Sequence, residues 1–302
     1  MKFFISTALV VLSVTTQLSH ADKPQALKSQ VLKPQVLKPQ ELWQQQGFLQ
    51  PESVLANETT KELYVSNMNG QPLEANGKGY ISRVSPKGAI LEKEWITGLN
   101  APKGMAHKGN WLYVADLQTL HIIDIEKGQL HQSIKVNGSK MLNDIATDTQ
   151  GNVYVSDMLA GGIYRLKNQK IEQWISAKTI PHPNGLYFDQ ATSTLILGTW
   201  GEGLQDDFST TVLGGLFSIN ISSAEITPLK GAQNIGNLDG ITKIAGVIYF
   251  NDWINGNVYR YQNETTSLVF NAGKNAADIS SWNNQLLVPM MFSERLDAYI
   301  IN

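Results

Sequence analysis

Tyr64-Val65-Ser66-Asn67-Met68 is the first of six similar five-residue segments in this chain. The other copies are Tyr113-Val114-Ala115-Asp116-Leu117, Tyr154-Val155-Ser156-Asp157-Met158, Ile196-Leu197-Gly198-Thr199-Trp200, Tyr249-Phe250-Asn251-Asp252-Trp253 and Leu287-Val288-Pro289-Met290-Met291. The third residues of successive copies lie 49, 41, 42, 53 and 38 positions apart. This spacing brackets the roughly 40 to 50 residues of one four-stranded propeller blade, so the six copies predict six blades.

The sequence around the copies is typical of an all-β protein. From Glu52 onward, short β-branched and aromatic runs alternate with clusters of Gly, Asn, Asp and Pro, which indicates strands and turns rather than helices. A further strand beginning with glycine follows several copies, at 79–84, 162–166, 215–219 and 256–261. We therefore predict a six-bladed β-propeller. A β-sandwich is the alternative, but it does not explain six similar copies.

The last copy is followed by only one more strand, at 296–301, so its blade lacks an outer strand. Segment 41–48 is the only remaining candidate for that strand. We predict that this N-terminal segment closes the ring by pairing with the last blade, which protects both edges. The propeller domain is predicted to span 41–302.

The N-terminal region has the features of an export signal followed by a linker. Residues 1–21 contain Lys2, an apolar run and the small-residue pattern Ser19-His20-Ala21, which predicts a signal peptide cleaved after Ala21. Its apolar run of about a dozen residues is shorter than the roughly 20 that span a bilayer, and no membrane span is expected after cleavage. Residues 22–40 repeat a Lys/Pro/Gln-rich unit, which favours a solvated linker.

Composition narrows the expected environment and partners. The chain has no cysteine, which excludes disulfides and, for an exported protein, favours the bacterial periplasm. Its formal charge of −2 becomes −3 once Lys2 is removed, and its basic residues are scattered. This pattern argues against a nucleic-acid partner. We expect a small-molecule partner, while the oligomeric state is not indicated by the sequence.

One polar residue precedes the first strand of each repeat: Glu52, Lys103, Asn143, Asn184, Asp239 and Asp278. The first strand of a propeller blade is innermost, so these side chains should converge near one mouth of the channel. Converging carboxylates repel one another unless a cation or Lys103 compensates. Carboxylate and amide oxygens favour a hard cation such as Ca²⁺, with Mg²⁺, Mn²⁺ and Zn²⁺ as alternatives. Zinc is disfavoured because the histidines at 107, 121, 131 and 182 are scattered.

From Glu52 to Asn302 the chain resembles the regucalcin/gluconolactonase (senescence marker protein) family of lactonase propellers. The resemblance rests on Pro51-Glu52-Ser53-Val54, Leu142-Asn143-Asp144, Pro183-Asn184-Gly185-Leu186-Tyr187-Phe188-Asp189 and Leu238-Asp239-Gly240-Ile241. It implies that Glu52, Asn184 and Asp239 ligate the metal, and that Asn143 is a fourth ligand or orients the substrate. It also implies a metal-activated water, with Asp239 as the base. On this basis Asp239 and Asn143 are the candidate catalytic residues.

One departure from the family concerns the substrate. The lactonases carry an arginine that contacts the sugar acid two positions before the asparagine of the third blade, and here that position is Met141. Lys140 is adjacent but is expected to face the opposite way along an extended segment. The sequence therefore does not favour a sugar-acid lactone. The candidate substrate pocket comprises Lys103, Met141, Trp200, Trp253 and Asp278.

The fourth and fifth residues of the repeated segment are interpreted mainly as structural. Its fifth residue is always large and apolar, and we interpret this position chiefly as blade packing. The alternative is an apolar wall around the channel mouth, most of all at Trp200 and the loop 201–214. The fourth residues Asn67, Asp116, Asp157 and Asp252 are predicted to cap turns by accepting backbone hydrogen bonds, not to act in catalysis.

Three functional hypotheses follow. The first is a divalent-metal-dependent hydrolase of a lactone or related ester, with calcium as the favoured ion. The second is a non-catalytic periplasmic propeller that binds a ligand or a protein, because a fold does not determine a function. The third is an enzyme of the strictosidine-synthase-like propeller type, which is expected to lack the full acidic ligand set.

Overall fold

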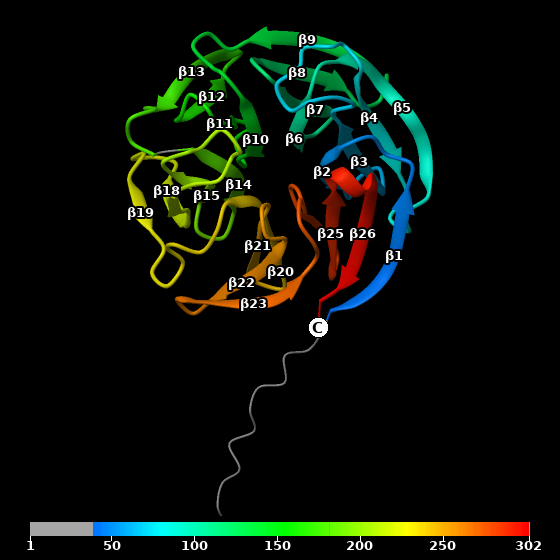
Figure 1. The fold of residues 1–302 in the computed structure, drawn as a ribbon. Coiled ribbons are helices and arrows are strands. Elements are labelled where there is room, and N and C mark those ends of the chain that lie inside the picture. Colours follow the sequence, from blue (N-terminus) through cyan, green and yellow to red (C-terminus); the bar gives the residue numbers. More distant parts are fainter. Residues whose placement is uncertain (1–38, 181, 302) are drawn as a thin grey trace, which may run out of the picture. The chain divides into compact units, whose positions relative to one another are not determined.

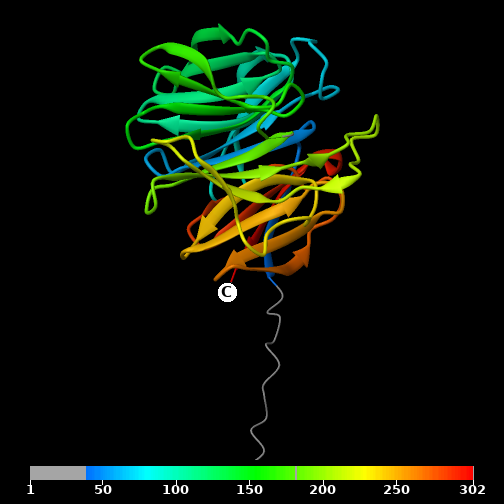
Figure 2. The same cartoon turned by 90° about the vertical axis from the view of Figure 1, so that its left-hand side faces the viewer.

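The computed structural model describes residues 39–180 and 182–301. The predicted signal peptide, 1–21, and almost all of the predicted linker, 22–40, lie outside the described residues. Six four-stranded antiparallel sheets are arranged in a ring around a central channel (Figure 1), and Figure 2 shows the same sheets from the side of the ring. The predicted six-bladed β-propeller is confirmed.

Each blade is a meander in which consecutive strands follow one another outward from the channel (Figure 1). Blade 1 contains β2 (Pro51–Asn57), β3 (Glu62–Asn67), β4 (Gly79–Val84) and β5 (Ile90–Leu99). Blade 2 contains β6 (Pro102–Lys108), β7 (Trp111–Asp116), β8 (Thr119–Asp124) and β9 (Gln129–Lys135). Blade 3 contains β10 (Leu142–Thr147), β11 (Val153–Asp157), β12 (Ile163–Lys167) and β13 (Lys170–Ile175).

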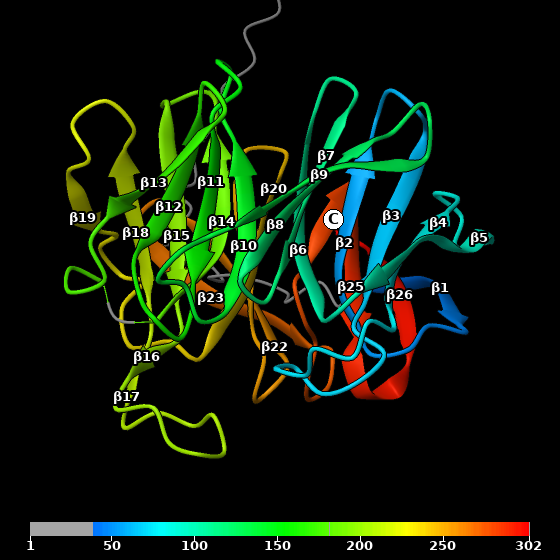
Figure 3. The ribbon, with the colours of Figure 1, turned by 90° about the horizontal axis from the view of Figure 1, so that it is seen from above.

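The remaining blades depart from this plan in two places. Blade 4 contains β14 (Pro183–Asp189), β15 (Thr194–Thr199), β18 (Leu216–Asn220) and β19 (Ile226–Pro228), with the hairpin β16 (Gly201–Glu202) and β17 (Val212–Leu213) inserted. Blade 5 contains β20 (Leu238–Ile244), β21 (Val247–Asp252), β22 (Asn257–Gln262) and β23 (Thr265–Asn271). Blade 6 contains β24 (Ser280–Trp282), β25 (Gln285–Met290), the 3₁₀ turn η1 (Met291–Ser293) and β26 (Arg295–Ile300). Figure 3 shows the β16–β17 hairpin projecting beyond the blades.

The outer strand of blade 6 comes from the other end of the chain. β1 (Gln40–Gln46) pairs antiparallel with β26, from Gln40 opposite Ile300 to Gln46 opposite Arg295. This pairing covers an edge that would otherwise be free to pair with another chain. The predicted closure of the ring by the N-terminal segment is confirmed.

Apolar clusters at the six blade interfaces hold the ring together. β3 shows why the repeated segment is apolar on consecutive residues: Leu63 and Val65 pack against blade 6, while Tyr64 packs against blade 2. Side chains alternate between the two faces of a strand, and here both faces are covered by neighbouring blades. The repeated segment is therefore apolar on consecutive residues because each blade lies between two neighbours.

Within residues 39–180 and 182–301, no helix has the length and apolar character that a membrane crossing requires.

Candidate functional site

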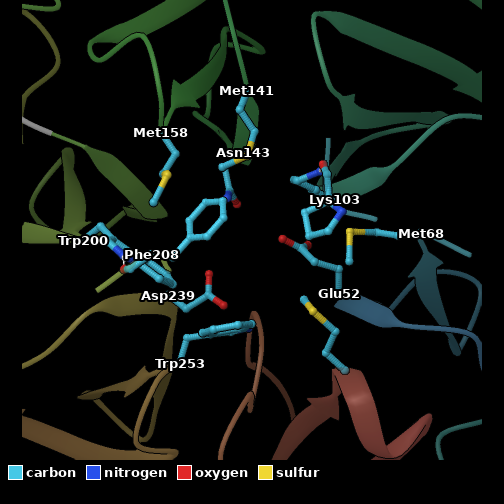
Figure 4. A pocket seen from close by; sticks show the side chains of 12 residues that line it. Glu52, Met68, Lys103, Met141, Asn143, Met158, Trp200, Phe208, Asp239 and Trp253 are labelled. Carbon is cyan, nitrogen blue, oxygen red and sulfur yellow. Dashed lines mark hydrogen bonds between the residues drawn. The ribbon is translucent and has the colours of Figure 1, made fainter. Parts of the chain in front are cut away.

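One mouth of the central channel contains a cavity of about 70 Å³, which we call the mouth cavity. It is lined by Glu52, Met68, Pro72, Lys103, Met141, Asn143, Met158, Trp200, Phe208, Asp239, Trp253 and Met291. Figure 4 shows the carboxylates of Glu52 and Asp239 and the amide of Asn143 pointing toward its centre. Four of the six polar residues predicted to converge thus line one cavity, together with the predicted pocket residues Met141, Trp200 and Trp253.

A β-bulge places the polar residue in each of the first five blades. In blade 1, Pro51 lies opposite Asn67 and Val54 lies opposite Val65, so Glu52 and Ser53 share the space opposite a single residue. The same register shift follows the first residue of β6, β10, β14 and β20. A bulge bends a strand and re-aims its side chains. It therefore explains how a polar residue at the start of an apolar strand reaches the channel.

The third residue of the repeated segment holds several of these bulges. The hydroxyl of Ser66 accepts a hydrogen bond from the Ser53 amide at 2.9 Å, and the hydroxyl of Ser156 accepts one from the Asp144 amide at 2.9 Å. In blade 5 the Asn251 side-chain oxygen accepts one from Gly240 at 2.9 Å. Each bond satisfies a buried amide that the bulge removes from the regular ladder.

The fourth residue of the segment fixes the backbone just before the polar residue. The Asp157 carboxylate accepts hydrogen bonds from the amides of Lys140 at 2.8 Å and Met141 at 3.0 Å, two residues before Asn143. Asp116 accepts equivalent bonds from Asn100 and Ala101, both at 2.8 Å. The prediction that these residues cap turns is confirmed, and the turns capped by Asp116 and Asp157 lead to Lys103 and Asn143. Asp252 instead caps the turn after its own strand, accepting bonds from Ile254 at 3.0 Å and Asn255 at 3.4 Å.

The backbones of blades 4 and 5 approach each other closely next to the candidate site. Gly185 follows Asn184, and a Cβ atom at Gly185 would overlap the carbonyl oxygen of Asp239 in the next blade. Only glycine leaves room for this approach. Blades 4 and 5 are therefore held close enough for the Asn184 side-chain amide to donate to Asp239 Oδ1 at 3.0 Å and to the Leu238 carbonyl at 3.1 Å.

The charges of the site are strongly perturbed by burial. Burial, and then the charge of Asp239, raises the pKa of Glu52 well above its usual range. Burial, and then the charge of Asp278, does the same for Asp239. Burial lowers the pKa of Lys103, whose ammonium group donates to the carbonyls of Pro72 and Ala101, both at 2.9 Å. The isolated site therefore disfavours its own negative charge, which is the condition a cation would relieve.

Three buried oxygens of the predicted ligand set lack hydrogen-bond partners: Glu52 Oε2, Asn143 Oδ1 and Asn184 Oδ1. Leaving such an atom unpaired costs about 1–3 kcal/mol, and more for a charged group. Two carboxylates and two amide oxygens are donors that suit a hard cation. By this test, the side chains of Glu52, Asn143, Asn184 and Asp239 fit a divalent ion such as Ca²⁺.

No three His, Asp or Glu side chains within 39–180 and 182–301 form a group that could hold a metal ion. None of the four histidines in this part of the chain lines the mouth cavity. Any ion in the channel mouth would therefore depend on the asparagine oxygens as well as the two carboxylates.

Two predicted site residues lie apart from the mouth cavity. Asn184 is fully buried beside Asp239 and does not line it. Asp278, predicted as a pocket residue, instead lines a second cavity of about 290 Å³ farther along the channel, with Asp144 and His107. Its carboxylate accepts a hydrogen bond from the Ser53 hydroxyl, and burial raises its pKa to about 7. Blade 6 places this residue differently because β24 begins only at Ser280.

The fifth residues of the repeated segment do more than pack blades. Met68, Met158, Trp200, Trp253 and Met291 all line the mouth cavity, and only Leu117 of the six does not. Met68 and Met291 belong to a packed cluster with Ala101 and Ala277, which agrees with blade packing, the favoured interpretation. That interpretation is incomplete because the same two side chains also line the cavity. Met141 lines the cavity while Lys140 is exposed, as predicted.

The alternative interpretation placed loop 201–214 in the apolar wall but did not single out Phe208, which reaches the mouth cavity from this loop between β16 and β17. The unusual 53-residue spacing between the fourth and fifth copies was the only signal of this insertion. The hairpin has no counterpart in the other blades, so no repeat alignment could assign a position to this aromatic ring.

No family model matches this chain, and no curated protein matches it. Several solved structures are similar. A gluconolactonase-family protein has a TM-score of 0.62 and 14% identity, over 88% of this chain and 92% of its own. Virginiamycin B lyase from Staphylococcus aureus, with quinupristin, has a TM-score of 0.58 and 15% identity, over 88% and 99%. A chain of the nidogen/laminin complex has a TM-score of 0.59 and 14% identity, over 76% and 92%. At these identities the likeness establishes the fold alone.

Proposed function

We propose that this protein is a divalent-metal-dependent hydrolase of a lactone or related ester, with Ca²⁺ as the metal. The observation that carries the proposal is the set of unpaired buried oxygens on Glu52, Asn143 and Asn184 beside the Asp239 carboxylate. Buried polar atoms without partners are rare, and a missing ion is one of their ordinary explanations. The similar gluconolactonase-family structure is compatible with this activity but does not carry it.

In this proposal Glu52, Asn143, Asn184 and Asp239 hold the ion. When bound, it would polarise the ester carbonyl and lower the pKa of water at the site. Lys103 is held by two backbone carbonyls, and its charge offsets part of the rise that burial and Asp239 cause in the pKa of Glu52. It therefore favours the ionised form of Glu52 that cation binding requires.

Asp239 is proposed as the general base. Its carboxylate is oriented by the bond from Asn184 and, in the ion-free protein, burial raises its pKa. Water attacks the carbonyl carbon, a new C–O bond forms, and Asp239 takes the proton. The bond to the leaving alkoxide oxygen breaks, and that oxygen receives the proton. The products are an alcohol and a carboxylic acid, which releases its remaining proton to solvent at neutral pH; in a lactone both groups stay in one molecule.

The proposed place of action is the bacterial periplasm. The support is the export pattern of residues 1–21 and the absence of cysteine from the sequence.

The proposal is tested by hydrolysis of a panel of lactones and aryl esters, with and without a chelator. We expect activity that is lost with chelator, regained with Ca²⁺, and reduced at least 100-fold in Asp239→Asn. Glu126→Gln, an exposed carboxylate-to-amide change far from the mouth, is the matched control. Absence of activity across the panel, or wild-type rates in Asp239→Asn, would contradict the proposal. Ion and ligand binding without turnover would instead favour the non-catalytic propeller.

A further inference from the structure

Most of the wall of the mouth cavity is apolar and surrounds a small polar centre. Apart from Glu52, Lys103, Asn143 and Asp239, the lining residues are all apolar or aromatic: Met68, Met141, Met158, Met291, Pro72, Trp200, Trp253 and Phe208. Methionine side chains are unbranched, flexible and polarisable, so a wall of four methionines adapts to apolar groups of different shapes. The polar groups at the centre can fix an ester while this wall surrounds its substituent.

The same wall is poorly suited to a polyhydroxy substrate. The indole N–H of Trp200 already donates to the Phe208 carbonyl at 2.7 Å. Two of the three Lys103 ammonium protons are taken by backbone carbonyls. Sugar hydroxyls facing this wall would lose their bonds to water without replacement, which is costly.

The β16–β17 hairpin brings an aromatic ring over the polar centre. Phe208 packs with Met141, Met158, Trp200 and Leu204. Its backbone has φ of 65°, a left-handed conformation that is uncommon for a bulky residue. The turn around it is closed by bonds from the Phe208 amide to Gln205 and from the Gln205 amide to Ser209. The insertion in blade 4 thus holds one aromatic side chain at the mouth (Figure 4).

Apolar side chains continue from the cavity onto the surrounding surface. Phe292 is 58% exposed, and its ring centroid lies 6.1 Å from that of Trp253. Leu73 is 50% exposed and directly follows Pro72 of the cavity wall. Val212 and Leu213, in the stem of the hairpin, are also exposed. Figure 3 shows η1 and the hairpin projecting on the same side of the ring.

We propose that the substrate is an ester or lactone carrying an alkyl or aryl substituent, with Phe208, Trp253 and Phe292 as specificity-determining residues. This inference rests on the proposed hydrolase function. The cavity of about 70 Å³ accommodates the reacting group and the first atoms of the substituent. The remainder lies across Trp253 and Phe292, because exposed apolar surface joined to a cavity is where an apolar ligand gains most from leaving water.

The test measures kcat/KM for γ-butyrolactones with unbranched tails of increasing length, beside glucono-δ-lactone as the polar comparator. We expect kcat/KM to rise about 2- to 4-fold per methylene until the tail passes the rim. Phe208→Ala should flatten this rise, and Phe292→Ser, a change at an exposed position of the rim, should do so only for the longest tails. Leu130→Ala, an exposed leucine of the outer strand β9, should keep the wild-type slope. Melting temperatures of all variants exclude loss of folding.

The outcomes separate this inference from the proposed function. Hydrolysis without dependence on tail length, or preference for glucono-δ-lactone, overturns the inference and leaves the hydrolase. If nothing is hydrolysed, the proposed function fails, and quenching of tryptophan fluorescence by alkyl γ-lactams tests the pocket by itself. Affinity that increases with tail length in wild type but not in Phe208→Ala supports the apolar site, and flat affinity overturns it. Vesicle binding or self-association abolished by Phe292→Ser also overturns it, since the rim would then serve a membrane or a second copy.

Discussion

Asp157 offers a sharp test of how the repeated segment positions the site. Its buried carboxylate accepts three backbone hydrogen bonds, from Lys140 at 2.8 Å, Met141 at 3.0 Å and Ala160 at 2.9 Å. Asp157→Ala removes all three hydrogen bonds and leaves the three amides, which are buried or partly buried, without this acceptor. At about 1–1.5 kcal/mol for each of the three bonds, we expect a loss of about 3–4.5 kcal/mol in the free energy of unfolding.

This loss is a large fraction of the 5–15 kcal/mol typical of a folded domain. It is measured by urea unfolding, where the midpoint should fall while the slope stays unchanged. Because the freed backbone leads to Asn143, calcium affinity should fall as well. Asn67→Ala is the comparison in blade 1, where the side-chain oxygen accepts one backbone amide, that of Leu49 at 3.1 Å. The Asn67 side-chain amide also donates to the Val65 carbonyl at 3.0 Å and to the Ser82 hydroxyl at 3.1 Å. A loss below about 1 kcal/mol in Asp157→Ala, or unchanged calcium affinity despite a large loss, would refute the reasoning.

Three further predictions concern the ring and its charges. Gly185→Ala should prevent close approach of blades 4 and 5, because the new Cβ overlaps the Asp239 carbonyl. The melting temperature and the calcium affinity should both fall. A wild-type melting temperature would contradict this prediction. Deletion of β1 should leave the outer edge of β26 unpaired, while its other edge stays paired with β25. Size-exclusion chromatography should then show aggregates, whereas a stable monomer would refute ring closure as the cause. In the ion-free protein, burial raises the pKa of Asp278 from 3.8 to about 7, so the folded state keeps a proton that the unfolded chain has released. The free energy of unfolding should therefore fall as pH rises from about 4 to above 7, and Asp278→Asn should weaken this fall in denaturant titrations at fixed pH.

The fold could be predicted from the sequence because one physical pattern repeats. Leu63, Tyr64 and Val65 are apolar in succession since both faces of β3 meet a neighbouring blade. The missing outer strand of blade 6 followed from the same count, and pairing of β1 with β26 supplied it. Because the same strand pattern recurs in every blade, the strands of one blade could be predicted from those of the others.

The site could be predicted only in part, because its details depend on local departures from the repeat. The alignment found Glu52, Asn143, Asn184 and Asp239, but the bulges that turn them inward arise from strand register, which no single segment encodes. Asp278 was assigned to the same pocket by analogy, although its blade begins its first strand later. Phe208 comes from an insertion with no equivalent in the other five blades.

Calcium titration of chelator-treated, full-length protein tests the central claim most directly. Calorimetry should give one strong site per chain, and the melting temperature should rise with calcium because the ion binds only the folded state. At 100 times the dissociation constant the stabilisation should approach about 2.7 kcal/mol. Glu52→Gln, Asn184→Leu and Asp239→Asn should each weaken binding, while Glu126→Gln should not. An unchanged melting temperature and no detectable binding at millimolar calcium, or wild-type affinity in all three site variants, would contradict the account.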